Sequence, residues 1–540
     1  MFPQSALIAF LLPLGLWLTL VASAQRKSEP RAAAAGFVAL AVSSLTYLAV
    51  GFGLMFGGVG ILGGGQRQFS ELSAYFALPV DGGVWAIAGL KGFFLEGVAQ
   101  GKGLFVAWLP LAQACATLAA VSLWRRHSLL AVGVAAALAT LAFSVAGMAA
   151  WGGGIGATLG TQLRLGHGPV DFGGLGIAGV IAGTFALLAS GRSAGQANEL
   201  PESPHPFRAA IGIGLAIIGA ASVLAANPLT PTPEAAVPDY AIVIVTAAGV
   251  ACLASLGYSV FVSKRPSIET VTASVLAALI AVSSGAMSLP IWAAGLLGLA
   301  SALSVIGGGF LWNGKIDGAD TGPGVPRLLI PAALGLLTAG IAATGAYGAG
   351  VNGIGADAYL GTRGLGLSGL IGAAGGIADP GQVTAQLAML LLCVGVAVVL
   401  GLPLRLFTAS EDVTQPATAT AAAEVSVEAV AQASAPQAPI DVSHEPVPVE
   451  ADEPLPVVAR PLAPVFAGAP EPLRVAAAPA TPPTPPAPPP KTVPSAVAPT
   501  TPAAQTPPPT PVIRAPNLLE RLRGSRPVEK PKPIGQARRV

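Results

Sequence analysis

The main pattern along the chain is a series of long apolar runs separated by short polar segments. A helix needs about 20 apolar residues to cross a bilayer core of about 30 Å. Eleven runs meet or nearly meet this length, near 5–24, 33–57, 103–124, 128–151, 173–191, 208–226, 239–263, 270–287, 289–312, 327–348 and 382–408. The pattern therefore predicts an all-α membrane protein with eleven transmembrane helices.

The last quarter of the chain is polar and rich in proline. Residues 409–540 hold 30 of the 50 prolines and contain no apolar run of membrane length. Such sequence favours extended polyproline II segments and cannot bury a core. We expect a transmembrane domain over 1–408 and a disordered Pro/Ala-rich tail over 409–540. The basic end of the tail either binds a partner, such as anionic lipid or an acidic protein, or is simply solvated.

Composition excludes several classes of protein. The chain is 53% hydrophobic and only 10% charged, whereas ordinary globular chains carry about 25% charged residues. A cytosolic multidomain enzyme, a nucleic-acid-binding module and a disulfide scaffold are therefore excluded. Cys115, Cys252 and Cys393 lie singly within apolar runs, where we expect buried apolar side chains. No Walker loop, metal-ligand spacing or nucleophile–base set is present, so we predict no enzyme activity, cofactor or metal.

Lys and Arg in the short loops predict the orientation in the membrane. With the N-terminus outside, the inner loops hold Arg26, Lys27, Arg31, Arg125, Arg126, Arg192, Arg208, Lys264, Arg265, Lys315, Arg327 and Arg405. The outer loops then hold only Arg67, Lys91, Lys102, Arg164 and Arg363. This bias predicts an N-out/C-in topology with a cytoplasmic tail. Residues 1–24 lack the positive start of a signal peptide, so we favour a retained helix over a cleaved leader.

Several segments, taken in order, carry a family resemblance. They are Val50–Gly57, Trp151–Gly154, Val170–Gly174, Lys264–Ser267 and the acidic segment from Lys315 to Asp320. Together they resemble the ammonium transporter / Rhesus (Amt/Rh) channel family over about residues 1–408. The resemblance implies two inverted five-helix repeats plus a final helix, assembled as a homotrimer in the plasma (or inner) membrane, with a pore in each subunit.

The resemblance also implies functional residues at an outer vestibule. In the family, ammonium is recruited there, loses a proton and crosses a narrow apolar pore. Trp151 matches the vestibule tryptophan, a platform on which a cation gains roughly 0.5–2 kcal/mol; the alternative role is an interfacial anchor. Asp171 matches an intramembrane aspartate, which we expect to shape the vestibule while held by backbone donors at a helix N-terminus. Ungapped counting places Gln113 and Val223 at the two phenylalanines that gate the family pore.

The facing pore histidines of the family are missing from this chain. Counting from neighbouring motifs places Gly179 and Leu329 at the two positions. The chain's histidines are His127, His167, His205 and His444, and none lies in the middle of a predicted helix. A pore without this pair can still pass neutral ammonia or another small neutral gas, but it lacks an imidazole proton relay.

Two functions therefore remain open. The leading one is ammonium or ammonia transport through a pore in each subunit, with an altered mechanism. The alternative is a non-conducting membrane sensor or scaffold that signals through its cytoplasmic tail and a protein partner there. The combination of a retained fold, altered pore residues and the long segment 409–540 is the reason to keep the second possibility.

Overall fold

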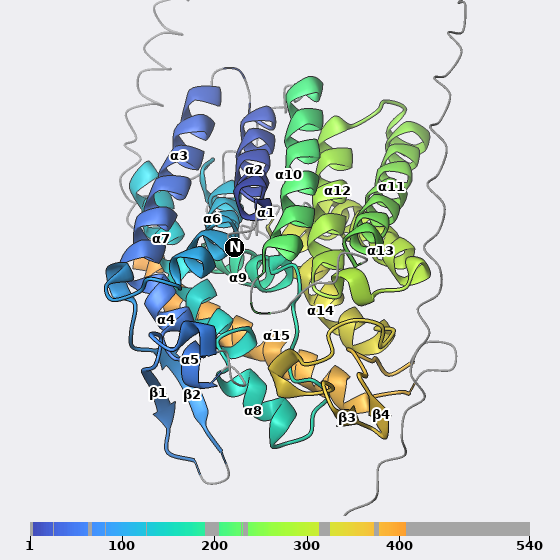
Figure 1. The fold of residues 1–540 in the computed structure, drawn as a ribbon. Helices are drawn as coiled ribbons and strands as arrows, with labels where there is room; N and C mark the ends of the chain where they lie inside the picture. Colours follow the sequence, from blue (N-terminus) through green and yellow to red (C-terminus); the bar gives the residue numbers. More distant parts are fainter. Residues whose placement is uncertain are drawn as a thin grey trace, which may run out of the picture. The chain divides into compact units, whose positions relative to one another are not determined.

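The described chain is built from helices that run back and forth between two ends (Figure 1). The computed structural model describes residues 4–406 except 25, 27, 63–66, 81–82, 126, 190–204, 228, 230–235, 313–323 and 372–376. These residues all belong to one compact unit, Met1–Gln437. The expected tail, the acidic segment from Lys315 to Asp320 and His444 lie outside the described residues.

The first half of the chain contains the following helices. They are α1 (Ser5–Ile8), α2 (Leu11–Ala22), α3 (Glu29–Thr46), α4 (Phe52–Phe56), α5 (Val59–Leu62), α6 (Lys102–Leu123), α7 (Leu129–Ala150), α8 (Ile155–Thr161) and α9 (Leu175–Ala189). A π-helical turn, η1 (Tyr47–Gly51), joins α3 to α4. Short 3₁₀ turns, η2 (Arg67–Phe69) and η3 (Phe93–Leu95), lie in the segment between α5 and α6.

The second half begins at α10 (Pro206–Ala226). It continues through α11 (Ala236–Ser263), α12 (Ile268–Ser283), η4 (Ala286–Ser288), α13 (Ile291–Trp312), η5 (Val325–Leu329), α14 (Ile330–Ala342), η6 (Val351–Gly353) and α15 (Pro380–Gly401). Two antiparallel hairpins complete the described structure: β1 (Tyr75–Leu78) with β2 (Trp85–Gly89), and β3 (Ala358–Tyr359) with β4 (Thr362–Arg363). Both hairpins and α8 lie at the same end of the bundle (Figure 1).

The helices agree with the apolar runs read from the sequence. Each of the eleven runs overlaps a helix of the described chain. Within the described residues, nine helices are long and apolar enough to cross a membrane, and Leu175–Ala189 and Ile268–Ser283 are shorter apolar helices. The all-α membrane class is therefore confirmed, while the number of crossings and the N-out orientation stay predictions.

The two halves of the bundle pack in the same pattern. Helix α2 packs along α10, the first helix of the other half. In the first half α3, α6 and α7 contact one another, and in the second half α11, α12 and α13 do the same. Helix α9 packs on α6 as α14 packs on α12. In the order α2, α3, α6, α7, α9, α10, α11, α12, α13, α14, each helix lies five positions from its counterpart. This packing is the one expected of inverted five-helix repeats.

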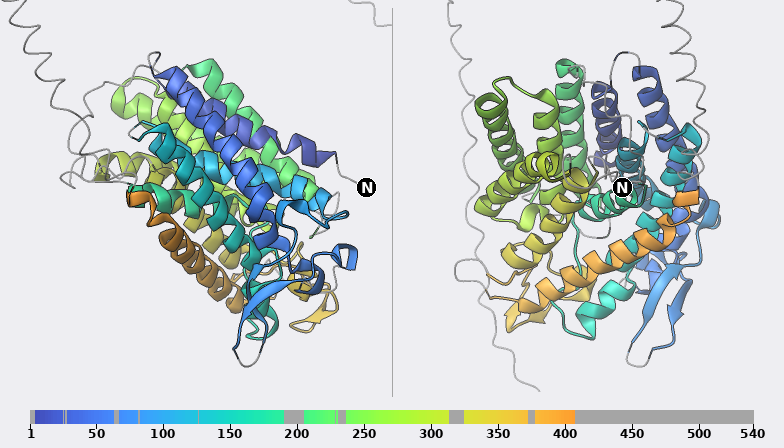
Figure 2. Two further views of the ribbon diagram at one scale, coloured as in Figure 1. Left: turned by 90° about the vertical axis from the view of Figure 1, so that its left-hand side faces the viewer. Right: turned by 180° about the vertical axis from the view of Figure 1, so that it is seen from behind.

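Helix α15 stands outside the repeated pattern. It packs against α7, α9 and α14, and so contacts both halves. Seen from behind, it crosses the bundle obliquely (Figure 2). This is the place of the expected final helix.

Small residues let the helix backbones approach closely, as expected in lipid, where no hydrophobic force draws helices together. A methyl group added at Gly15 of α2 would collide with main-chain atoms of Gly212 and Ala216 in α10. One added at Gly219 would collide with the backbone of Leu12. The seam between the halves therefore depends on glycine.

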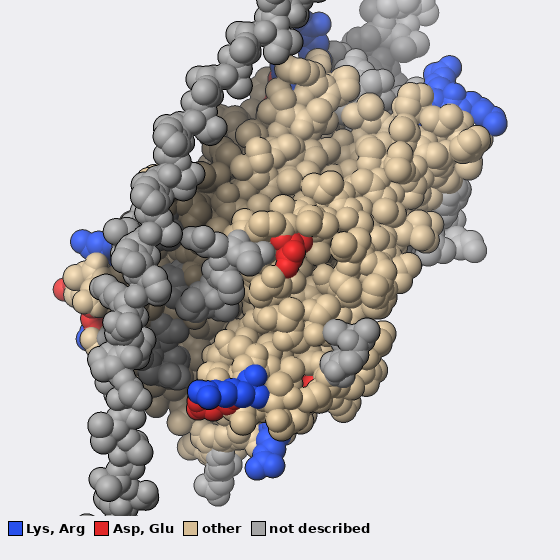
Figure 3. All heavy atoms as spheres, turned by 45° about the vertical axis from the view of Figure 1, so that its right-hand side comes forward, with Lys and Arg blue, Asp and Glu red and all other residues tan. Residues whose placement is uncertain are grey.

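Charged side chains lie mainly toward the ends of the bundle. At the end expected to face the cytoplasm, Arg208 pairs with Glu29, and Arg327 pairs with Glu269 at 2.9 Å. Figure 3 shows a broad face of mostly uncharged side chains, with one acidic group near its middle and other charged groups closer to its edges. Such a face is suited to the hydrocarbon core of a bilayer.

Candidate functional site

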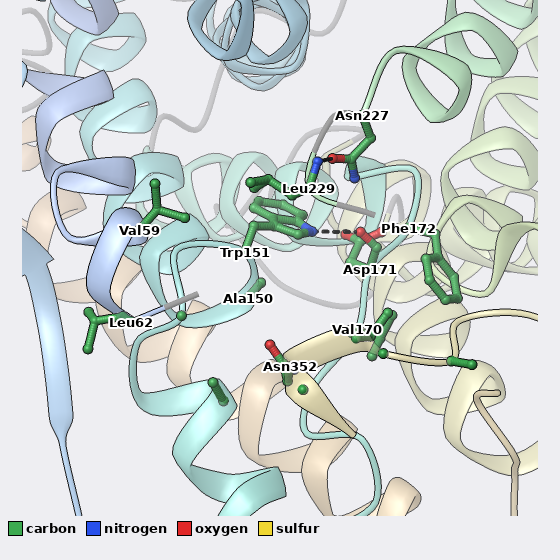
Figure 4. A pocket seen from close by; sticks show the side chains of 16 residues that line it. Val59, Leu62, Ala150, Trp151, Val170, Asp171, Phe172, Asn227, Leu229 and Asn352 are labelled. Atoms are coloured by element: carbon green, nitrogen blue, oxygen red, sulfur yellow. Dashed lines mark hydrogen bonds between the residues drawn. The ribbon is translucent and has the colours of Figure 1, made fainter. Parts of the chain in front are cut away.

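A cavity of about 320 Å³ lies where the end of α7 meets the segment that leads into α9. Figure 4 shows Trp151 and Asp171 together at this cavity. The lining residues are Val59, Leu62, Ala150, Trp151, Gly153, Ala157, Val170, Asp171, Phe172, Asn227, Leu229 and 349–353. The structure thus brings together the two residues that the sequence analysis placed at a vestibule, which are 20 residues apart along the chain.

The Trp151 ring is fixed in its position at the cavity. Its indole Nε1 donates a 3.0 Å hydrogen bond to the main-chain carbonyl of Asp171 (Figure 4). The ring centroid lies 4.3 Å from that of Trp108 and 5.7 Å from that of Phe143. The side chain is only half-buried, so part of the ring remains accessible. A half-buried ring held in one orientation is suited to present its face to a cation.

The aromatic packing extends beyond Trp151. The Trp108 ring also packs on Phe56 at 5.5 Å, and Phe56 packs on Phe52 at 5.7 Å. The sequence analysis did not single out Trp108, whose ring packs on Trp151 although it does not line the cavity. A signal was present, because Phe105 and Trp108 are three residues apart and share one face of a helix.

The Asp171 carboxylate is fully buried and caps α9. Its Oδ1 accepts a hydrogen bond from the Gly174 amide at 2.9 Å, and its Oδ2 accepts one from the Ile177 amide at 2.7 Å. Both bonds lie at the N-terminus of α9, where the helix dipole favours a negative charge. These are the backbone donors expected for a carboxylate at this depth. The acid therefore stabilises the start of α9 at the cavity.

His167 braces the loop that precedes Asp171. Its ring lies edge-on to Tyr359 at 5.1 Å, and its Nε2 lies 3.2 Å from the Leu365 carbonyl oxygen. Asn352, which lines the cavity, donates to the His167 carbonyl at 2.7 Å. Burial lowers the pKa of His167, although the Leu365 carbonyl and Asp379 act in the opposite direction. The ring is thus packed against Tyr359 and the Leu365 carbonyl and does not itself line the cavity.

The two residues assigned to the gate occupy different surroundings. Gln113 is buried between α6 and α3, where its Nε2 donates to Ser44 Oγ at 2.8 Å. It does not line the cavity, and the ring that packs on Trp151 from α6 is that of Trp108. Val223 is buried on α10, one turn before Asn227, which does line the cavity.

Gly179 and Leu329, the two positions that counting from motifs assigns to the pore, do not lie directly opposite each other. A methyl group at Gly179 would lie 2.8 Å from Ala332 Cβ and 2.8 Å from Ile280 Cγ2. A methyl group at Gly183, one turn further along α9, would lie 2.6 Å from Leu329 Cβ. Ala332 therefore faces Gly179, and Leu329 faces Gly183.

A π-helical turn, η5, lies at the start of this contact between α9 and α14. Val325–Leu329 form a π-helical turn, which accommodates an extra residue compared with an α-helix. Residues in and after such a turn face other directions than α-helical counting predicts. At Gly179 the space that a side chain would need is already filled by the neighbouring helices.

The histidines of the described chain lie away from this contact. His127 is in the turn between α6 and α7, His205 is the N-cap of α10, and His167 is in the loop before α9. His205 is exposed, as expected of a loop residue. Cys115 and Cys393 are buried and Cys252 is partly buried. In the described part of the chain, no group of three His, Cys, Asp or Glu side chains is arranged to hold a metal ion.

Comparison with known proteins agrees with this fold. Residues 1–410 match the family model of the Ammonium Transporter Family. A structure described as a sensor Amt protein is 19% identical, with a TM-score of 0.57, over 76% of this chain and 92% of that one. Candida albicans Mep2 is 16% identical, with a TM-score of 0.55, over 75% and 82%. Saccharomyces cerevisiae Mep2 is 16% identical, with a TM-score of 0.54, over 74% and 83%. A search of curated proteins found no match.

The solved structures establish the fold, and the family match covers well over half of the sequence. Together with the apolar helices, the match identifies a multi-pass protein of the plasma membrane. The matched family consists of transporters and channels and is not an enzyme family. The chain therefore belongs to the ammonium transporter family.

Proposed function

We propose that this protein recruits ammonium at the cavity beside Trp151 and Asp171 and passes it as ammonia between its two helix repeats. The carrying observation is the juxtaposition of a fixed, half-buried indole with a buried carboxylate at one cavity. A cation on the indole face is stabilised by roughly 0.5–2 kcal/mol. The Asp171 carboxylate adds a favourable field while its own oxygens are occupied by amides of α9. Its proposed role is to shape the site.

The proton is lost before the midplane, because an ion in the centre of a bilayer costs several kcal/mol. The helices α9 and α14 contain no imidazole in the described chain, so the proposed route has no histidine relay. The neutral molecule passes apolar side chains and leaves its proton on the outer side. We keep Gln113 and Val223 as candidate gate residues, and Gly179 and Leu329 as candidate lining residues, within this proposal.

Passage at Gly179 requires movement. The methyl-sized space beside it is filled by Ala332 and Ile280. Even a small molecule passes there only when α9 and α14 move apart. The proposed mechanism is therefore gated transfer of a neutral molecule, and it differs from flow through a permanently open histidine-lined pore.

The filled space at Gly179 also favours a second function, that of a non-conducting ammonium receptor. Such a protein needs the vestibule but no passage. It signals through its cytoplasmic tail to a protein partner there. A solved structure described as a sensor Amt protein shares the fold. In either case we propose a homotrimer, as the family resemblance implies.

Liposome reconstitution distinguishes the two functions. The full-length protein is placed in vesicles that contain a pH-sensitive dye, and an inward ammonium gradient is applied. Transport predicts faster internal alkalinisation than in protein-free vesicles, and Trp151→Ala should slow it. If alkalinisation is no faster than in protein-free vesicles but the protein still binds ammonium, the receptor function is favoured. If alkalinisation is no faster than in protein-free vesicles and the protein binds no ammonium, both functions are contradicted.

A further inference from the structure

We infer that Gln382 and Gln386 of α15 are positioning residues that set the orientation of the vestibule tryptophan. The two residues are four apart and lie on one face of an otherwise apolar helix. Both side chains are fully buried. The inference deepens the proposed ammonium site and rests on it for its functional consequence. Its structural content, a coupling between α15 and Trp151, can be tested without transport.

Gln382 holds the beginning of the segment before Asp171. Its Oε1 accepts a hydrogen bond from the His167 amide at 2.8 Å. Its Nε2 donates to the Gly168 carbonyl at 2.7 Å. One side chain thus satisfies a backbone donor and a backbone acceptor in a loop that has no helix or strand partner for them.

Gln386 holds the end of the same segment in the same way. Its Oε1 accepts from the Val170 amide at 2.9 Å, and its Nε2 donates to the Val170 carbonyl at 2.8 Å. The spacing of one helical turn between the glutamines matches the extended loop. Four hydrogen bonds therefore fix the loop backbone from His167 to Val170 against α15.

The residue after this segment is Asp171, which lines the cavity. The hydrogen bonds that fix the segment therefore also restrict the position of Asp171. The Asp171 carbonyl accepts the hydrogen bond of the Trp151 indole. The Asp171 carboxylate caps α9 on the other side. Asp171 is thus held between α15 and α9, and a shift of the loop moves the acceptor that orients the Trp151 ring.

Helix α15 is itself fixed against α9 at its far end. A methyl group at Gly401 would lie 2.6 Å from Leu188 Cδ1. At its N-terminus, Asp379 Oδ1 accepts from the Gly381 amide at 3.1 Å, and its Oδ2 accepts from the Tyr359 hydroxyl at 2.8 Å. The helix is therefore a firm support from which the glutamines hold the loop.

Buried amides in a membrane helix are costly unless all their polar atoms are bonded. Both glutamines bond at both ends of their amide groups, and every bond goes to the loop before Asp171. Methionine has a similar length and shape but cannot make these bonds. Replacing either glutamine with methionine should free the loop while leaving the packing of α15 largely intact.

The functional test uses the full-length protein in liposomes with Gln382→Met and Gln386→Met. The control is Thr384→Val, because Thr384 lies on the exposed side of the same helix. We expect each glutamine variant to raise the half-saturating ammonium concentration about fivefold, the effect of losing about one buried hydrogen bond. The maximal rate should change less than about twofold. Unchanged half-saturation, or a fall in maximal rate alone, would overturn the inference.

A second readout needs no transport. Tryptophan emission is recorded for Gln386→Met in the wild-type and in the Trp151→Phe background. We expect a spectral shift that disappears when Trp151 is absent. No shift, or the same shift in both backgrounds, contradicts the inference even in a protein that moves no ammonium. If Gln386→Met does not fold, Gln386→Glu keeps the acceptor for the Val170 amide and serves for both readouts.

Discussion

The indole Nε1 of Trp151 donates a 3.0 Å hydrogen bond to the main-chain carbonyl of Asp171. This single bond joins Trp151, the C-cap residue of α7, to the residue that caps α9. The ring orientation and the start of α9 are therefore parts of one structural unit. A substitution at Trp151 or at Asp171 should therefore alter the cavity.

Trp151→Phe should weaken ammonium recognition less than Trp151→Ala does. Phenylalanine keeps a ring that can pack on Trp108, but it loses the bond to Asp171 and has a weaker cation–π interaction. We expect half-saturation to rise about threefold for phenylalanine and about tenfold or more for alanine. Concentration-dependent uptake or equilibrium binding measures this. Equal effects of both substitutions would show that the ring face is not the recognition element.

Asp171→Asn should lower the stability of the protein. The amide removes the charge at the N-terminus of α9 and offers only one good acceptor for the Gly174 and Ile177 amides. We expect the free energy of unfolding to fall by about 1–3 kcal/mol. Denaturant unfolding in detergent, followed by circular dichroism, measures the change.

Glu71→Gln provides the matched control for Asp171→Asn. Glu71 Oε1 accepts from the amides of Gln100 and Gly101 at the start of α6, and Glu71 does not line the cavity. Besides lowering stability, Asp171→Asn should raise half-saturation by ammonium, because Asp171 holds the Trp151 indole at the cavity. Glu71→Gln should leave half-saturation unchanged. A change as large as that for Asp171→Asn would mean that the effect reflects general loosening of the outer loops.

Gly179→Ala should destabilise the contact between α9 and its neighbours. The added methyl group would lie 2.8 Å from Ala332 Cβ and 2.8 Å from Ile280 Cγ2, inside their contact distances. Overpacking of this kind costs about 1–3 kcal/mol. Ala332→Gly in the same protein removes one of the two contacts and should restore part of the loss.

The control for this helix contact is Gly395→Ala. Nothing in the described chain lies within 4 Å of a methyl group at Gly395. The stability of the Gly395→Ala protein should therefore equal or slightly exceed that of the wild-type protein. The midpoint of thermal unfolding in detergent is measured for Gly179→Ala, for Gly179→Ala with Ala332→Gly, and for Gly395→Ala. Wild-type stability of Gly179→Ala would show that the space beside Gly179 is open.

The outer loops should lose stability in mild acid through His167. Burial lowers the pKa of His167, so the folded loop takes up a proton at lower pH than the unfolded chain does, near 6.5. The stability that neutral His167 contributes to the folded loop is therefore complete above about pH 6.5. It decreases as the pH falls below that value. Nearby Asp379 opposes this shift.

Hydrogen exchange of the loop before α9 measures this effect between about pH 7.5 and pH 5.5, after correction for the intrinsic pH dependence of exchange. We expect protection to fall at the lower pH in the wild-type protein. His167→Gln removes the titrating group and should give a flatter response. The same pH response in both proteins would exclude His167 as the origin.

The sequence predicted the helices well because an apolar run of membrane length has few alternative structures. Asp171 was interpretable for a similar reason, since a buried carboxylate before a helix needs the amides at its N-terminus. Gln382 and Gln386 were visible as a polar pair four residues apart in an apolar run. Their partners were not, because these lie in a loop more than 200 positions earlier.

The facing of α9 and α14 was beyond sequence reasoning for another reason. Apolar patterning does not distinguish a π-helical turn from an α-helical one, so the extra residue in Val325–Leu329 could not be anticipated. The side-chain direction of Gln113 had the same difficulty. Its bond to Ser44 depends on how α6 is rotated against α3, which an almost uniformly apolar helix does not reveal.

The most direct test of the central claim is equilibrium binding of methylammonium to the full-length protein in lipid nanodiscs. The account predicts saturable binding that weakens about tenfold or more in Trp151→Ala and is unchanged in Thr384→Val. Absent binding, or equal affinity in the wild-type protein and Trp151→Ala, would contradict a recognition site formed by Trp151 beside Asp171.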